Sequence, residues 1–320
     1  EYSKDDEEAF IRFQQTPDPA DDLSLIPRLS VDDLPHRISR IKHSQREGIY
    51  LMPMMTGGIV YTDILFDVSD FTYEELDALN IFARLLSMCG ADGMDYPEFQ
   101  TELRFVSGGY AFYLESGSDS DGNEKVFLTA RLKSLPGLEK DGLDLIRKLF
   151  LSCGITEERI KAALTDISTD FQSSSISSGH TYAMSAAAES FSPSLYIGER
   201  LSGMTCWYIV KHMLASDISA LSGRIAAAGR KAIARNRMLM HITAEDSDMD
   251  AAWRSASEFA LLIPEGESPS LIRHKVPSLP DRMAYTASTD VSFVGISGKG
   301  AAMSSDRAAS DKIYLSILSS

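Results

Sequence analysis

The chain has 320 residues, of which 44% are apolar and 24% are charged, and these values are typical of a globular protein with a substantial core. A net charge of −15 argues against a nucleic-acid-binding protein, whose binding face would be basic; the charge either favours a positively charged partner or only keeps the protein in solution. No apolar run approaches the ~20 residues of a membrane span, and the acidic start "EYSKDDEEAF" is not a signal peptide, so we expect no membrane partner.

Residues 1–46 are predicted to be the end of a helix followed by an extended connector. "DDEEAFIRFQQ" indicates the helix, and the two prolines of "TPDPADD" end it because proline is excluded from a helix interior. The proline-punctuated stretch "LSLIPRLSVDDLPHRI" then predicts a connector laid across a surface. The chain does not begin with Met, so we expect it to be a piece of a longer protein.

An α+β domain is predicted to begin near Glu47. "GIYLMPMMTGGIVYTDILFDVS" predicts two strands around a Gly57-Gly58 turn. Residues 70–90, "DFTYEELDALNIFARLLSMCG", predict a helix that is apolar almost all the way round and therefore buried. "YPEFQTELRF" predicts a short helix with Pro97 in its first turn. "GGYAFYLES" and "EKVFLTARLKS" predict a hairpin, because apolar residues alternate along both.

The second half of this domain is predicted to be mostly helical. Helices are expected in "PGLEKDGLDLIRKLFLSCG", in "TEERIKAALTDISTDFQS" with Thr156 as its N-cap, and in "GERLSGMTCWYIVKHMLA" and "ISALSGRIAAAGRKAIAR". "MLMHITA" predicts a strand and "SDMDAAWRSASEFALLI" a helix. This order predicts an α+β fold over residues 47–280, with helices packed on one face of an antiparallel sheet. In residues 281–320, "DVSFVGIS" predicts a strand and "DKIYLSIL" a helix, as the truncated start of a second related domain.

The chain offers few residues suited to catalysis or metal binding. The buried helix of residues 70–90 carries only Asp77, Asn80 and Arg84 as candidates. No two of the six histidines lie within six residues of each other, so the paired-histidine helix of a zinc peptidase is absent from the sequence. "GISGKGAAMS" fails the P-loop pattern at two specifying positions and predicts a turn. The sequence therefore predicts no catalytic residue and no metal ligand, and it leaves any substrate-binding residues unknown.

The cysteines and one basic stretch also favour structural roles. Cys89, Cys153 and Cys206 are far apart in the sequence and sit among apolar residues, which favours buried, unreactive thiols. The absence of a disulfide pattern predicts a reducing compartment, either the cytoplasm or, in a eukaryote, an organelle matrix. Between residues 218 and 244 all charged residues are basic, and they favour the solvated face of a helix or pairing with a neighbouring surface over an anion site: Arg224, Arg230, Lys231, Arg235 and Arg237.

Four segments in order resemble a known family. "QQTPDPADDLSLIPRLSVDDLP", "GGIVYTDILFDVS", "VSGGYAFYL" and "SSGHTYAMSAAAESFS…GERLSGMTCWYIVKHM" are similar to the presequence-protease branch of the pitrilysin/insulinase zinc metallopeptidases. In that family two halves, each of two related α+β domains, are joined by a helical hairpin and close around a peptide. The resemblance implies, in order, the end of the hairpin, a connector, the non-catalytic third domain and the opening of the fourth: residues 1–22, 23–46, 47–280 and 281–320.

The resemblance also assigns a position to the buried helix. It corresponds to the helix that carries the inverted zinc motif H-x-x-E-H in the catalytic domain of the family. In this chain Leu79, Asn80, Phe82 and Ala83 stand where zinc chemistry would need His and Glu, and none of them is a useful zinc ligand. The resemblance therefore implies a core helix, with the zinc and the Glu base in an absent N-terminal half.

The expected function is that of a non-catalytic portion of a zinc metalloendopeptidase that degrades short unstructured peptides, in which this portion forms chamber wall. Its expected partners are peptides, with basic ones favoured by the acidic surplus, and the N-terminal half of the same protein. The alternative is a scaffold protein that keeps the fold without catalysis in either half, and a weaker third possibility is a free-standing ligand-binding protein. An H-x-x-E-H motif encoded upstream separates the enzyme from the scaffold.

Overall fold

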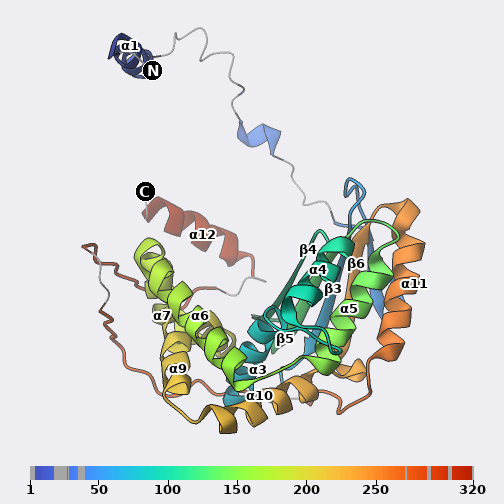
Figure 1. The fold of residues 1–320 in the computed structure, drawn as a ribbon. Coiled ribbons are helices and arrows are strands. Elements are labelled where there is room, and N and C mark those ends of the chain that lie inside the picture. Colours follow the sequence, from blue (N-terminus) through green and yellow to red (C-terminus); the bar gives the residue numbers. More distant parts are fainter. Residues whose placement is uncertain are drawn as a thin grey trace. The chain divides into compact units, whose positions relative to one another are not determined.

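The computed structural model of the chain divides into two units, Glu1–Ile41 and Lys42–Ser320 (Figure 1). The first unit contains helix α1, Lys4–Gln15, and a single 3₁₀ turn, η1, Val31–Asp33. The α1 helix agrees with the helix expected before the two prolines, while 10 of the 24 residues of the expected connector, 23–46, lie outside the described residues. The residues that the structure describes are 4–17, 27, 29–34, 40–270, 272–286, 290–301 and 305–318.

The second unit is built on a six-stranded sheet with the order β1-β2-β6-β3-β5-β4. Four of the five neighbouring pairs are antiparallel, and β2 with β6 is the parallel pair. The predicted α+β fold class is confirmed, and so is the β4–β5 hairpin. The strands are β1 Ser44–Arg46, β2 Ile49–Pro53, β3 Val60–Asp67, β4 Gly109–Ser118, β5 Glu124–Ser134 and β6 Met238–Ala244.

Strands β2 and β3 are both present, but they do not pair with each other across the Gly57-Gly58 turn, as a hairpin would. Strand β6, from nearly 180 residues later in the chain, lies between them, with Ile242 opposite Leu51 of β2 and Thr62 of β3. The inward residues of β6 are buried, and a position with a neighbouring strand on each side satisfies the backbone hydrogen bonds of such a strand. The two strands predicted around Gly57-Gly58 are therefore present, but they are not paired with each other.

The helices pack on one face of this sheet, as predicted. Phe150 of α5 contacts Phe66 of β3 with ring centroids 5.4 Å apart, and α3, α5 and α11 together cover the inward face. The helices of this unit are α3 Tyr73–Leu86, α4 Tyr96–Val106, α5 Glu139–Ser152, α6 Glu157–Ser177, α7 Gly179–Ala188, α8 Pro193–Ser202, α9 Met204–Leu214, α10 Ile218–Ala232, α11 Asp246–Leu262 and α12 Arg307–Leu318, with 3₁₀ turns η2 Glu189–Phe191 and η3 Arg235–Arg237.

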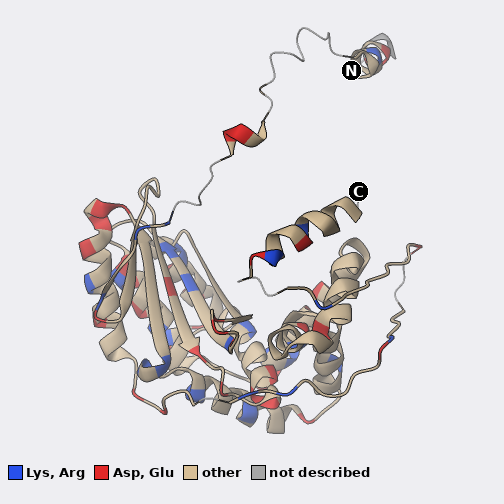
Figure 2. Ribbon diagram, turned by 180° about the vertical axis from the view of Figure 1, so that it is seen from behind, with Lys and Arg blue, Asp and Glu red and all other residues tan. Residues whose placement is uncertain are grey.

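The opposite face of the sheet is not covered by any described helix, and the strands are seen directly from behind (Figure 2). Along β3, buried inward residues alternate with half-buried outward ones, which is the two-residue period of a strand between a core and a partly solvated face. We refer to the uncovered side as the open sheet face. Its members include Tyr61, Asp63, Leu65 and Asp67 of β3, Phe127 and Arg131 of β5, and Leu239 and His241 of β6.

Helix α3 is the buried helix that the sequence predicts. It begins with a capping box, in which the Thr72 hydroxyl accepts from the Glu75 amide and the Glu75 carboxylate accepts from the Thr72 amide. Nine of its fourteen residues are buried. The capping interactions fix the start of the helix, and the apolar surface on most sides explains why it lies inside the protein.

The predicted strand in "DVSFVGIS" is wrong. Residues 290–297 form no strand, and residues 293–297 contact α7 instead. The ring of Phe293 lies against Gly179, and the Ser297 hydroxyl donates to the Ala187 carbonyl. A helix offers an extended segment no backbone ladder, so the segment has strand-like alternation without strand pairing. The helix expected in "DKIYLSIL" is present as α12.

Candidate functional site

The three polar residues of α3 that could have carried chemistry are all bound to neighbouring helices. Asp77 forms a close ion pair with Arg200 of α8. The Asn80 amide donates to the Leu201 carbonyl at 2.9 Å. Arg84 pairs with Asp166 and, at 2.8 Å, with Asp170, both on α6. Each side chain therefore holds α3 to another helix.

The Asp77 pair illustrates the electrostatics of this core. Burial raises the pKa of the Asp77 carboxyl, and the hydrogen bond from Arg200 only partly opposes that shift. The Arg200 guanidinium also lies over the rings of Tyr73 and Tyr196, at 5.1 and 5.7 Å from their centroids. This arrangement satisfies a buried charge from several sides, which is the requirement for a structural ion pair.

The positions that the family resemblance assigns to a zinc motif contain core residues. Leu79, Phe82 and Ala83 are buried, and Asn80 is bound as described. Across the residues that the structure describes, no three His, Cys, Asp or Glu side chains come together as a metal site would require. Helix α3 packs between the sheet and helices α6, α8 and α10.

The open sheet face is the first candidate contact surface. Asp63 accepts from Arg131 at 2.7 Å, and Lys125 lies 3.0 Å from Asp67. Burial alone would raise the pKa of Asp63, but the hydrogen bonds from His241 and Arg131 bring it below its usual value. The charges on this face are thus balanced by one another.

Apolar side chains lie between these charged pairs. At the end of the sheet near the β4–β5 turn, Leu65, Phe127 and Leu239 line a shallow hollow of about 530 Å³, together with Glu115, Asp67 and Lys125. A partly solvated mixture of apolar and paired charged groups is typical of a surface that makes contacts with a peptide or protein.

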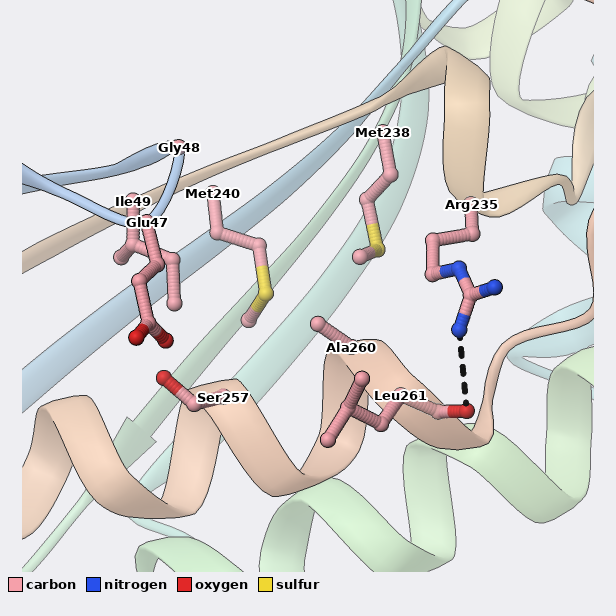
Figure 3. Close-up of a pocket in the computed structure, with 9 residues that line it drawn as sticks. All are labelled: Glu47, Gly48, Ile49, Arg235, Met238, Met240, Ser257, Ala260 and Leu261. Carbon is pink, nitrogen blue, oxygen red and sulfur yellow. Dashed lines mark hydrogen bonds between the residues drawn. The ribbon is translucent and has the colours of Figure 1, made fainter.

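A second candidate is a pocket on the other side of the sheet, between the sheet and α11 (Figure 3). We refer to it as the α11 pocket. Its volume is about 270 Å³. No local sequence pattern predicts it, because its walls come from segments about 190 residues apart. It is lined by Glu47, Gly48, Ile49, Arg235, Met238, Met240, Ser257, Ala260 and Leu261.

The basic residues between 218 and 244 are bound within the fold in three cases. Lys231 pairs with Glu75 at 2.7 Å, and Arg235 pairs with Glu265. Arg237 is almost fully buried and pairs with Asp70 at 2.6 Å. Lys231, Arg235 and Arg237 therefore pair with neighbouring surfaces of the fold, which was one of the two expectations, and do not form a solvated helix face.

The structure brings together two of the three cysteines. The Cys89 thiol donates to the Gly154 carbonyl at 3.4 Å, and its interaction with the neighbouring Cys153 thiol lowers the pKa of Cys89 and raises that of Cys153. The backbones of Ala91 and Cys153 also form an isolated β-bridge beside them. Cys206, on α9, is buried, and burial raises its pKa to about 12. All three thiols are free.

None of the described helices is both long and apolar enough to cross a membrane.

Comparison with known proteins places this fold in a family. The sequence profile of the region associated with peptidase M16, subfamily C, matches residues 4–213. The chain is 23% identical over 295 residues to presequence protease 1, chloroplastic/mitochondrial, of Arabidopsis thaliana, covering 89% of this chain and 27% of that protein. It is also 23% identical over 200 residues to the mitochondrial presequence protease of Saccharomyces cerevisiae, covering 61% of this chain and 20% of that protein.

A solved structure has the same fold. The crystal structure of a peptidase M16 inactive domain from Pseudomonas fluorescens aligns with a TM-score of 0.52 at 13% identity, over 74% of this chain and 54% of that one. The chain thus spans only a fifth to just over a quarter of the two presequence proteases. The resemblance to the presequence-protease branch is confirmed, and the chain belongs to the family of regions associated with subfamily C of the M16 peptidases.

Proposed function

We propose that this chain is the non-catalytic portion of a zinc metalloendopeptidase that degrades short unstructured peptides, and that its open sheet face forms part of the chamber wall. The observation that carries the proposal is the contrast between the two faces of the sheet. On one side α3 is a core helix in which Asp77, Asn80 and Arg84 are all bound to neighbouring helices. On the other, apolar and charged side chains are left without helix cover.

The proposal includes the parts that this chain would need from the rest of the protein. Residues 1–46 would be the linker end and connector, 47–280 the non-catalytic domain, and 281–320 the start of the next one. The zinc and its Glu base would lie in the N-terminal half. The compartment would be the cytoplasm or an organelle matrix, and the chloroplastic and mitochondrial names of two relatives support the second.

A preference for basic peptides is the finer part of the proposal. The net charge of −15 supports it at long range. At short range the carboxylates of Asp63 and Asp67 are already paired, so they contribute little to a contact. We therefore expect the preference to act through steering and to depend on salt.

Salt dependence gives a direct test of the charge preference. The intact protein should bind a basic amphipathic peptide more tightly than its charge-reversed version at low salt. The difference should shrink as the Debye length falls from roughly 30 Å at 0.01 M salt to about 8 Å at 0.15 M. Equal affinities at low salt would show that the charge serves solubility alone.

The wall itself is tested in the full-length protein with two matched variants. Leu239→Arg adds a charge on the open sheet face, and Leu151→Arg adds one on α5; both leucines are exposed to a similar extent, 39% and 45%. We expect Leu239→Arg to raise KM for a peptide substrate and Leu151→Arg to leave it unchanged. Identical kinetics for the two variants would refute the open sheet face as chamber wall. A full-length protein with no H-x-x-E-H motif and no peptidase activity would instead identify the scaffold.

A further inference from the structure

The α11 pocket has features that the proposed function does not use. It lies on the helix-covered side of the sheet, so the open sheet face cannot account for it (Figure 3). Its volume of about 270 Å³ is just below the ~300–1,000 Å³ of pockets for drug-sized ligands, which limits an occupant to a smaller molecule.

One end of the pocket carries an unpaired carboxylate. Glu47 has a φ of 50°, in the left-handed region, and Gly48 follows it with a φ of 81°. Two such residues between β1 and β2 form the kind of turn that favours Asn-Gly, so a Glu in the first position costs stability. Among the described residues its carboxylate has no hydrogen-bond or ion-pair partner. A strained position that holds a free charge at a pocket is a candidate for a binding role.

A second polar group points to the same end. The Ser257 hydroxyl on α11 is buried and has no hydrogen-bond partner in the described part of the chain. Figure 3 shows this hydroxyl and the Glu47 carboxylate at one end of the pocket. A buried hydroxyl without a partner costs free energy that a ligand could recover. Together the two groups offer acceptors for an ammonium group.

The middle of the α11 pocket is apolar, and its far end carries the Arg235 guanidinium. Ile49, Met238 and Met240 form an apolar wall, and methionine side chains adapt to ligands of different shape. At the far end the Arg235 guanidinium donates to the Leu261 carbonyl at 3.5 Å. Its ion-pair partner is Glu265, whose side chain is 75% exposed, and so solvated a pair is weak enough for another carboxylate to replace it.

We propose that the α11 pocket binds an apolar dipeptide in its zwitterionic form. The ammonium group pairs with Glu47 and donates to the Ser257 hydroxyl. The apolar side chains lie against Met238 and Met240, and the terminal carboxylate binds Arg235 in place of Glu265. The charge at each end of the pocket matches the opposite charge at each end of the ligand.

Isothermal titration of the 320-residue chain with leucyl-leucine tests this assignment, using N-acetyl-leucyl-leucine and leucyl-leucine amide as probes of the two charged ends. Binding should be weakened at least tenfold by either cap. Glu47→Gln should weaken binding of the uncapped dipeptide to a similar extent. The matched control Glu98→Gln, on α4 and outside the pocket, should leave it unchanged. No binding at millimolar dipeptide, or equal affinity for the capped and uncapped forms, would overturn the proposal.

Two further variants separate a binding role from a structural one. Glu47→Asn suits the left-handed turn better, so it should raise the unfolding midpoint while weakening dipeptide binding. Glu265→Gln removes the competitor for Arg235 and should strengthen binding. A Glu47→Asn variant that binds as the native chain does, or a Glu265→Gln variant that binds more weakly, would refute the assigned roles. These readouts do not involve peptidase activity, so they stand or fall apart from the proposed function.

Discussion

The buried pair of Arg237 and Asp70 gives the sharpest test of how this core is held together. Arg237 donates to both Asp70 oxygens, at 2.6 and 3.0 Å, and to the Asp67 carbonyl at 3.0 Å. The two side chains are only 1% and 7% exposed. In Arg237→Met the Asp70 carboxylate keeps a 3.1 Å bond from the Ser270 amide and loses its charge partner. We expect this change to cost about 3–5 kcal/mol, against a total stability of about 5–15 kcal/mol for a typical domain.

Urea denaturation followed by circular dichroism measures the effect, and Arg131→Met is the matched control. Arg131 also forms a two-point pair, with Asp63, but it is 46% exposed on its side chain, so its loss should cost less than about 1 kcal/mol. The double variant Arg237→Met/Asp70→Leu should recover most of the loss, because no buried charge is then left unpaired. Equal destabilisation by the two single variants would refute the reasoning.

The same pair predicts a pH dependence. Burial alone would raise the pKa of Asp70, but hydrogen bonds from Arg237 and Ser270 bring it below its usual value. A carboxyl group whose pKa is lowered on folding stabilises the protein above its unfolded pKa of about 3.9, and this contribution is lost as the pH falls through the folded value. The stability difference between native protein and Arg237→Met should therefore be full near neutral pH. It should narrow as the pH falls, first through the burial-raised pKa of Asp70 in the variant and then toward the lowered pKa in the native protein. A difference that stays constant down to pH 2 would contradict this linkage.

Three further predictions test other parts of the structure. Gly109 has a φ of 147°, so Gly109→Val should destabilise the fold by roughly 1–3 kcal/mol. The control Gly108→Ala should not, because its added carbon would come no closer than 4.0 Å to a neighbour. Unfolding midpoints equal to that of the native protein in both variants would show that neither glycine is needed. Purified protein should hold no stoichiometric zinc, and elemental analysis that finds about one tightly bound zinc per chain would overturn the assignment of α3 to the core. A Cys206 pKa of about 12 leaves about one thiolate in 10⁴ at pH 8, against about a quarter for an ordinary thiol. Cys206→Ala should thus leave the rate at which a thiol reagent labels the folded protein unchanged, and it should remove one labelled site in denaturant. Slower labelling of the folded variant would show that the Cys206 thiol is accessible in the native protein.

Local features of this protein could be predicted from its sequence because each depends on residues close together in the chain. The start of α3 is fixed by Thr72 and Glu75, three residues apart, and the apolar sides of that helix already indicate burial. The β4–β5 hairpin follows from alternation on both sides of a short turn. The lack of a zinc helix is also a local property, since the motif needs its ligands within one helical turn.

Other features depend on which distant segments meet, and no local pattern contains that information. The sequence marks β2, β3 and β6 as strands but does not order them, because several pairings bury similar apolar surface. Arg237 looks like a surface cation until Asp70 is placed beside it. Residues 290–297 have a strand-like pattern, but a strand forms only where a neighbouring ladder is available, and α7 offers none.

The sequence by itself thus determined most helices and strands, the fold class, the absence of a paired-histidine zinc motif and the family resemblance. It did not predict strand β1 or helix α7, and it predicted a strand at residues 290–297 that does not form. The tertiary structure alone decided the strand order, the burial of the Arg237–Asp70 pair, the meeting of Cys89 with Cys153 and the walls of the α11 pocket. The physical reason is that capping and periodicity are short-range properties of the chain. Strand pairing, ion-pair burial and pocket formation are instead set by the free energy of contacts between residues up to about 200 positions apart.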